Sequence, residues 1–208
     1  DTEIGEAYTL TYDYLILSPG GLASLPPIDG LDSPRVHTLR TVDDALALRE
    51  ASGTHAVVLG AGFIGLEATE ALAQRGFETH LVEYAEHVLP PLEVEMAMLI
   101  TQELRALGVC VHAGVAAQSV THGDDQDCVT LSDGTVLSAN VIVLSTGVRP
   151  DTAFAEAAGI ETKRGYILVD EHGRTSVDDI YAVGDGTMGR DHDRPVALAG
   201  PANRGGRL

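Results

Sequence analysis

The stretch VVLGAGFIGLEATEALAQRGFETHLVE, residues 57–83, decides the fold class. An apolar strand is predicted over residues 55–59, and it runs into the glycine turn GAGFIG at residues 60–65. A helix is predicted over residues 63–75 because apolar residues recur there at spacings of three and four, with Gly76 ending it. Its predicted buried face comprises Ile64, Ala68, Ala71 and Leu72. A second strand over residues 78–83 completes a predicted βαβ unit.

The glycine turn has the pattern of a dinucleotide-binding site. A GxGxxG alone is weak evidence, but this one follows a strand, opens a helix and has Glu83 at the end of the next strand. Gly60 permits the tight turn, Gly62 lets the backbone approach a pyrophosphate, and Gly65 lets the helix pack closely on the strand. The helix N-terminus offers free N–H groups to the pyrophosphate, and Glu83 can accept hydrogen bonds from the adenine ribose. The alternative is a packing turn without a ligand.

Other segments follow recognisable local patterns. A strand is predicted at residues 14–17, and the proline- and glycine-rich residues 22–34 are predicted to be a linker. In TVDDALALREASG, Thr41 and Asp44 have the spacing of a helix N-cap, with Gly53 as a stop.

Further along, a helix is predicted near residues 94–107 and a strand in GVCVH. Three short alternating segments, VAAQSV, DCVTL and TVLSA, indicate a small antiparallel meander. NVIVLST is a predicted buried strand that ends at Gly147, and DIYAVGD is the last clear strand.

Composition excludes several kinds of partner. Thirteen basic residues against 31 acidic ones give a net charge of −18, which repels nucleic acid and anionic membranes. No apolar run approaches the roughly 20 residues of a membrane-spanning helix, so a cytoplasmic protein is expected. Cys110 and Cys128 are too far apart for a CxxC pair, and Cys110 is expected to be a buried, inert thiol. The DHD at residues 191–193 is ligand-like, but a solvated loop is favoured and no metal site is predicted.

Six motifs in order identify a family resemblance from about Tyr12 to Arg207. They are YDYLILSPGG, LRTVDDA, GAGFIGLEATEAL, STGVRPDT, TSVDDIYAVGD and LAGPANRGGR. The chain resembles the FAD-dependent pyridine nucleotide–disulfide oxidoreductases, and most nearly the branch of coenzyme A-disulfide reductases, NADH oxidases and peroxidases. The resemblance implies an α/β fold: a Rossmann-like FAD/NAD(P)-binding domain with a β-meander, plus an incomplete second nucleotide-binding domain. Residues 1–48 would be a partial FAD-domain segment and linker, 49–148 the NAD-binding domain, and 149–208 the returning FAD-domain segment.

The resemblance also implies roles for individual residues. Gly147 and Glu67 would lie near the nicotinamide of NAD, with Phe63 and Ile64 lining the same approach. Glu67 has an alternative role, since a carboxylate in the first turn of a helix interacts favourably with the helix dipole. The residues implied to contact FAD are Ser18, Pro19, Gly20, Asp185, Ala199 and Gly200.

Three features of the family do not occur in these 208 residues. They are the GxGxxG of the FAD domain, the redox-active cysteine and the dimerisation domain. Neither Cys110 nor Cys128 aligns with that cysteine. We therefore expect an internal piece of a larger homodimeric enzyme, without a catalytic residue of its own, that mainly binds NAD and has lost FAD. The implied reaction passes hydride from NADH through flavin to a disulfide such as coenzyme A disulfide. The alternatives are an NADH oxidase or peroxidase acting on oxygen species, and a nucleotide-binding module without catalysis.

Overall fold

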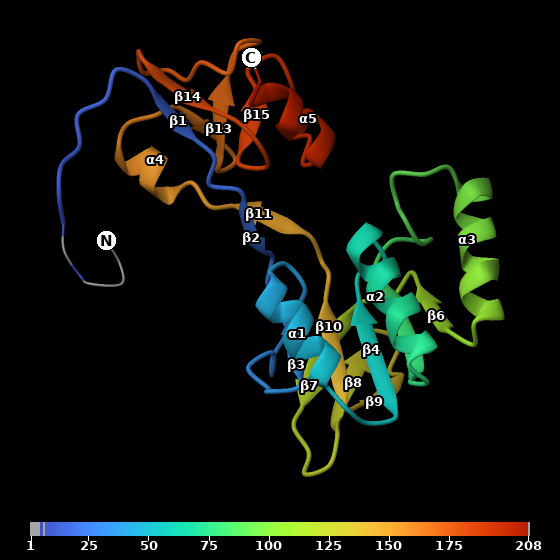
Figure 1. The fold of residues 1–208 in the computed structure, drawn as a ribbon. Coiled ribbons are helices and arrows are strands. Elements are labelled where there is room, and N and C mark those ends of the chain that lie inside the picture. The colour runs from blue at the N-terminus through green and yellow to red at the C-terminus, as the bar shows by residue number, and fades with distance from the viewer. Residues whose placement is uncertain (1–4, 6, 208) are drawn as a thin grey trace. The chain divides into compact units, whose positions relative to one another are not determined.

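A computed structural model describes residues 5 and 7–207 and divides the chain into two compact units (Figure 1). The central unit is Ala23–Val148, and the other, here called the terminal unit, combines Asp1–Leu22 with Arg149–Leu208. The short strands β2 (Gly21–Ala23) and β11 (Val148–Pro150), where the chain passes from one unit to the other, pair with each other.

A five-stranded sheet with strand order β3-β10-β4-β5-β6 forms the centre of the central unit. All neighbouring strands in it are parallel. The strands are β3 (Val36–Thr38), β4 (His55–Leu59), β5 (Glu78–Glu83), β6 (Cys110–Ala113) and β10 (Val141–Leu144). Because β4 and β10 face packed layers on both sides, Val57, Val58, Ile142 and Val143 are fully buried. The predicted βαβ unit and the α/β fold class are confirmed.

Three helices accompany this sheet: α1 (Val42–Glu50), α2 (Phe63–Gln74) and α3 (Val94–Ala106). Within α2 the predicted buried face is partly wrong, because Ile64 is 44% exposed and Ala71 is exposed. Gly65, Ala68, Thr69 and Leu72 are buried instead. The cause is the close approach of Gly65 to the backbone of Gly60, which fixes the side of the helix that meets the sheet.

The predicted N-cap of α1 is confirmed as a capping box. Thr41 Oγ1 accepts a hydrogen bond from the Asp44 amide at 3.1 Å, and Asp44 Oδ2 accepts one from the Thr41 amide at 3.0 Å. The helix ends at Glu50, before the predicted stop, and Arg75 donates to three carbonyls at this end, those of Leu48, Arg49 and Ala51. A cation there satisfies orphan carbonyls and complements the helix dipole.

The predicted antiparallel meander is also confirmed. It consists of β7 (Ala117–Thr121), β8 (Asp127–Leu131) and β9 (Val136–Ala139). Its apolar side chains form one core cluster with Val57, Leu59, Val82, Ile142 and Leu144 of the parallel sheet. The meander therefore covers one face of that sheet.

Residues 22–34 do not form the free linker that was predicted. Ile28 and Leu31 pack against the meander cluster, and the Val120 amide donates to Asp29 O at 2.7 Å. Ser33 donates to the buried Asp127 Oδ2 at 2.5 Å, and Arg35 pairs with Asp127 Oδ1 at 2.9 Å. These contacts group residues 23–48 with the central unit, although their sequence was assigned to the FAD-domain segment and linker.

A pair of histidines lies between the neighbouring strands β5 and β6. His80 Nδ1 is 2.9 Å from His112 Nε2, so one ring donates a hydrogen bond to the other. Burial lowers the pKa of His80, the nearby His112 and His55 lower it further, and the Glu78 carboxylate raises it in part. The folded state therefore favours the neutral form of His80.

This lowered pKa predicts a pH-dependent contribution to stability. A histidine whose pKa is depressed by folding binds more protons when unfolded, so its contribution is complete above about pH 6.5 and is lost as the pH falls below it. We expect the free energy of unfolding of the wild type to drop more than that of His80→Asn between about pH 7.5 and pH 5.5. Urea denaturation at both pH values measures this difference, and equal drops would contradict the prediction.

The terminal unit contains the remaining elements. They are β1 (Leu15–Leu17), α4 (Ala153–Ala157), β12 (Thr162–Lys163), β13 (Tyr166–Val169), β14 (Ile180–Ala182), β15 (Thr187–Gly189) and α5 (Ala199–Gly205). Strands β1 and β14 are parallel neighbours, while β12, β13 and β15 form a separate three-stranded sheet. The prediction that DIYAVGD is the last strand is wrong, because the short β15 follows it and pairs in parallel with β13.

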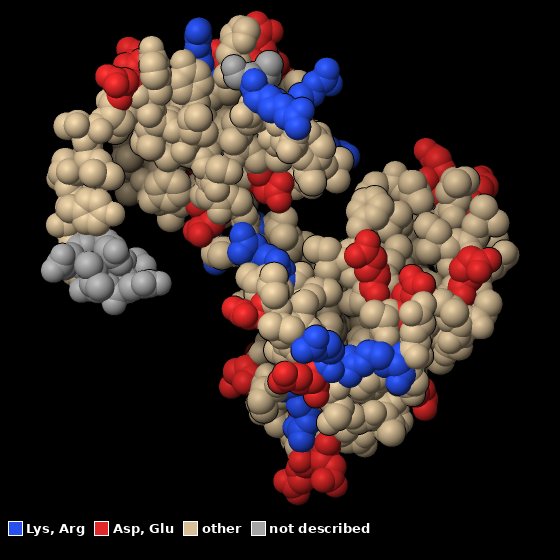
Figure 2. All heavy atoms as spheres, in the orientation of Figure 1, with Lys and Arg blue, Asp and Glu red and all other residues tan. Residues whose placement is uncertain are grey.

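Acidic side chains are scattered over the visible face of the central unit in Figure 2. In the part of the chain that the structure describes, no helix has both the length and the apolarity needed to span a membrane.

Candidate nucleotide-binding site

A cavity of about 560 Å³ opens in the central unit where β4, β5 and β10 end. The carboxyl ends of parallel strands are where open α/β sheets bind ligands. Of the residues predicted to bind NAD, Gly60, Gly62, Glu83 and Gly147 line this cavity. The remaining lining residues are Pro26, Pro27, Ile28, Leu59, Val82, Tyr84, Pro90, Val115, Ala116, Ala117, Ser145 and Thr146.

The three glycines of the turn differ in what the fold demands of them. Gly60 has φ +101°, and a Cβ there would lie 2.6 Å from Ser145 O. A Cβ on Gly65 would lie 1.9 Å from Gly60 O, so any side chain would push α2 away from the turn. Gly62 has φ −74°, and a Cβ there would meet nothing within 4 Å. The fold itself therefore requires Gly60 and Gly65, whereas a side chain on Gly62 would enter open space at the cavity.

The N-terminus of α2 supplies hydrogen-bond donors beside Gly62. The first helical bond runs from the Leu66 amide to Gly62 O at 3.0 Å, so the preceding amides have no intrahelical acceptor. Gly62 is the N-cap residue and has no side chain with which to satisfy them. These amides and the helix dipole favour an anionic group such as a pyrophosphate.

Glu83 is held in place by two backbone amides. Its Oε2 accepts from Ala61 at 2.6 Å and its Oε1 from Ala85 at 2.8 Å. An ionised carboxylate has about four lone-pair positions, so both oxygens can accept further hydrogen bonds. The side chain is half-buried and lines the cavity, which suits a ribose with two neighbouring hydroxyl groups.

Other residues named for NAD lie outside the cavity lining. Phe63 is 62% exposed, Ile64 and Glu67 are also exposed, and Gly65 is buried beneath the turn. The placement of Glu67 in the first turn of the helix is wrong, because α2 begins at Phe63 and Glu67 is its fifth residue. The dipole argument for a carboxylate there is correspondingly weaker, since the effect falls off within one turn.

Two parts of this cavity were not predicted from the sequence. Pro26 and Pro27 form part of its lining, although their segment was predicted to be a linker. Ser145 lies at the end of β10, with its hydroxyl 2.8 Å from Gly60 O. Ser145 is the first residue of the motif STGVRPDT, from which only Gly147 was given a role. Only the pairing of β10 with β4 places the serine beside the glycine turn.

Four of the residues predicted to contact FAD lie together in the terminal unit. The Val183 amide donates to Leu17 O at 3.0 Å, so Ser18 and Asp185 follow two neighbouring parallel strands. Gly186 packs closely on the Pro19–Gly20 segment. A Cβ on Gly186 would lie 2.9 Å from Pro19 Cγ and 3.3 Å from Gly20 O. The other two, Ala199 and Gly200, are exposed at the beginning of α5.

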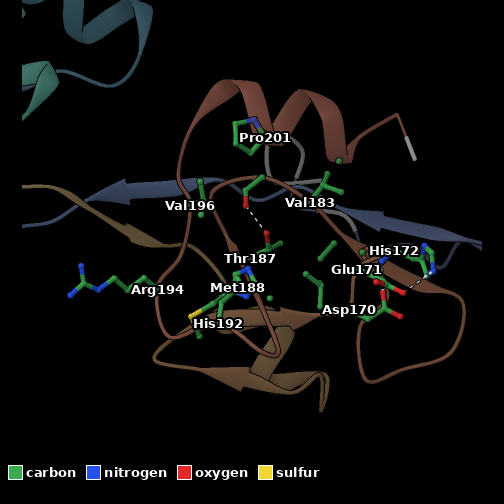
Figure 3. A pocket seen from close by; sticks show the side chains of 17 residues that line it. Asp170, Glu171, His172, Val183, Thr187, Met188, His192, Arg194, Val196 and Pro201 are labelled. Carbon is green, nitrogen blue, oxygen red and sulfur yellow. Dashed lines mark hydrogen bonds and ion pairs between the residues drawn. The ribbon is translucent and has the colours of Figure 1, made fainter. Parts of the chain in front are cut away.

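A smaller cavity of about 200 Å³ in the terminal unit is shown in Figure 3. It lies between the segment around His172, the β14–β15 region and α5, with Thr187 Oγ1 donating to Gly184 O at 2.8 Å. Among the described residues that line this smaller cavity, none is one of the six that were predicted to contact FAD.

Two further expectations concern cysteine and metal chemistry. The expectation that Cys110 is buried is wrong, because β6 is the edge strand of the parallel sheet and leaves this residue exposed. In the DHD segment, the Lys163 ammonium lies 3.1 Å from Asp193 and lowers the pKa of that carboxyl group. Among residues 5 and 7–207, no three histidine, cysteine or acidic side chains are grouped so as to hold a metal ion.

The parallel sheet, the meander and the cavity at the strand ends define a Rossmann-like unit of the kind found in FAD- and NAD(P)-dependent oxidoreductases. The chain belongs to the pyridine nucleotide-disulphide oxidoreductase family, and the match to this family covers residues 1–204. The resemblance inferred from the six motifs is thereby confirmed.

Individual members of the family resemble the chain over most of its length. An NADH oxidase of Methanocaldococcus jannaschii is 35% identical over 87% of the chain and 41% of its own length. Reduced CoADR-RHD of Bacillus anthracis is 35% identical with a TM-score of 0.91, over 99% of the chain and 38% of that protein.

A third similar protein is a water-forming NADH oxidase of Lactobacillus brevis bound to NADH. It is 28% identical, with a TM-score of 0.89, over 96% of the chain and 46% of that protein. A variant of this oxidase bound to NADPH has five substitutions, of which one removes an aspartate and two introduce arginine. The chain spans less than half of each of these relatives.

Proposed function

We propose that the central unit binds NADH for a FAD- and NADH-dependent oxidoreductase that reduces a disulfide such as coenzyme A disulfide. The observation that carries this proposal is Glu83, which two backbone amides hold beside the glycine turn in one cavity. Within that cavity, the amides at the start of α2 would bind the pyrophosphate, Glu83 the adenine ribose, and Gly147 would lie near the nicotinamide.

The chemistry of the whole enzyme would come from its cofactors. NADH supplies a hydride and the flavin relays the electron pair, so that NADH, a proton and a disulfide give NAD⁺ and two thiols. The residues of this chain would bind and orient the nucleotide. In the terminal unit, Ser18, Pro19, Gly20 and Asp185 would contact FAD, with Ala199 and Gly200 nearby.

A second candidate function is an NADH oxidase, favoured by the similarity to the two NADH oxidases. Both candidates share the NADH site and differ only in the electron acceptor, a disulfide or dioxygen. We further propose that the whole enzyme is a homodimer, as the family resemblance implies.

Nucleotide binding can be tested on the 208-residue chain. Calorimetric titration with NADH is expected to give one site per chain, and the purified chain is expected to be colourless. The reason for the missing colour is that a flavin pyrophosphate also needs a glycine turn that opens a helix. The turn at residues 60–65 opens α2 in the central unit, whereas the second GxGxxG, at residues 184–189, runs into the strand β15. No binding of NADH would refute the proposal, and a yellow protein with stoichiometric flavin would refute the expected loss of FAD.

The acceptor requires the whole enzyme. Under anaerobic conditions, consumption of one NADH per coenzyme A disulfide, with two thiols released, would support the reductase. NADH consumption that needs dioxygen and is indifferent to the disulfide would instead support the oxidase.

A further inference from the structure

The peptide group between Gly60 and Ala61 is held at both of its polar ends. Its N–H, on Ala61, donates to Glu83 Oε2 at 2.6 Å, and its carbonyl, on Gly60, lies 2.8 Å from Ser145 Oγ. Glu83 ends β5 and Ser145 follows β10, so two strands on either side of β4 hold one peptide of the glycine turn.

The hydroxyl proton of Ser145 has two carbonyl oxygens within reach. One is Leu59 O at 2.9 Å, which already accepts the backbone amide of Ser145 at 2.9 Å. The other is Gly60 O, which accepts no hydrogen bond from any other group among the described residues. A carbonyl without another donor gains more from the proton than one that already has a partner, so the hydroxyl donates to Gly60.

This contact matters because the peptide next to a glycine turns easily. Gly60 has φ +101°, a region that glycine populates freely, so its own backbone preference does little to keep the carbonyl turned away from the cavity. A carbonyl rotated toward the cavity would place a partial negative charge where an anionic pyrophosphate is to bind. The absent side chain of Gly65 leaves the room in which Gly60 O and Ser145 Oγ meet.

We propose that Ser145 is a positioning residue of the nucleotide site, fixing the Gly60–Ala61 peptide together with Glu83 so that the amides at the start of α2 face the pyrophosphate of NADH. This inference rests on the proposed binding of NADH. It assigns to Ser145 an effect on the phosphate-binding part of the site, beyond any contribution to the stability of the fold.

The test compares NADH with adenosine, which has the ribose and adenine but no phosphate. Ser145→Ala is expected to raise the dissociation constant of NADH about fivefold, the size of one neutral hydrogen bond, and to leave that of adenosine unchanged. Ser145→Thr keeps the hydroxyl and is expected to restore NADH binding. Calorimetry for NADH and competition titration for adenosine give these constants.

Thr101→Val is the matched control. It removes another hydroxyl-to-carbonyl hydrogen bond, from Thr101 Oγ1 to Ala97 O at 2.9 Å within α3, and Thr101 does not line the nucleotide cavity. It is expected to leave both dissociation constants unchanged. If Ser145→Ala does not fold, Ser145→Cys replaces it, because a thiol is a much weaker donor and should give the same selective loss.

The outcomes separate this inference from the proposed function. A wild type that does not bind NADH overturns the function and the inference with it. A wild type that binds NADH while Ser145→Ala binds it equally well overturns only the inference. Equal losses for NADH and adenosine, or an equal loss in Thr101→Val, would also overturn it, because they indicate a general loosening of the fold.

Discussion

NADH is expected to bind about a hundredfold more tightly than NADPH, because the 2′-phosphate of NADPH would meet the carboxylate of Glu83. The phosphate brings between one and two negative charges, and repulsion at about 4 Å in a half-solvated site reaches a few kcal/mol. Glu83 cannot swing away without breaking its hydrogen bonds to Ala61 and Ala85.

No permanent cation follows Glu83 in the sequence as far as Leu89, and two basic side chains elsewhere in this part of the sequence, His87 and Arg75, have other partners. His87 Nδ1 lies 2.9 Å from Val88 O and is used as a donor there. Arg75 donates to the carbonyls of Leu48, Arg49 and Ala51 at the end of α1. Neither side chain is therefore free to neutralise a 2′-phosphate without losing these bonds.

Dissociation constants for both reduced nucleotides, measured for the wild type, Glu83→Ala and Glu86→Ala, test this preference. Glu83→Ala is expected to weaken NADH binding and to bring the ratio of the two constants close to one. Glu86→Ala removes the same charge from an exposed residue outside the cavity lining, so screening by salt should leave the ratio nearly unchanged. Equal affinities in the wild type, or an unchanged ratio in Glu83→Ala, would show that Glu83 is not the ribose ligand.

The substitution Gly62→Val is expected to weaken NADH binding at least about tenfold, or 1.4 kcal/mol, in a protein that still folds. The side chain would project into open space in the free protein, but it would occupy the place where the backbone must approach the pyrophosphate.

The substitution Gly65→Val is expected to lower the stability of the fold itself. Its Cβ would lie 1.9 Å from Gly60 O, so α2 must move and the thermal unfolding midpoint should fall by several degrees or more.

Thermal unfolding and calorimetric titration of the two variants together test the division of roles among the glycines. A Gly62→Val protein that unfolds near the wild-type temperature and binds NADH with unchanged affinity would refute the placement of the pyrophosphate. A Gly65→Val protein as stable as the wild type would show that the turn can relax more than its contacts indicate.

Much of the central unit could be predicted because its signals are local. The glycine turn, the 3.6-residue period of residues 63–75 and the short alternating segments each depend on neighbours only a few positions apart. The capping box of Thr41 and Asp44 is equally local, and the structure contains it at the position that the spacing of these two residues predicted. The resemblance of six ordered motifs then extended these signals to the family.

The sequence by itself determined the α/β class, the βαβ unit and the family of this protein, because those features depend on residue periodicity, turn chemistry and motif order. Only the tertiary structure decided that residues 23–48 pack with the central unit, that Gly65 faces the sheet in place of Ile64, and that Ser145 holds the turn at Gly60. Ser145 and Gly60 are far apart in the chain and become neighbours through the pairing of β10 with β4. Such contacts join residues whose local sequences contain no sign of each other, so the physical reason for them lies in strand order and close packing.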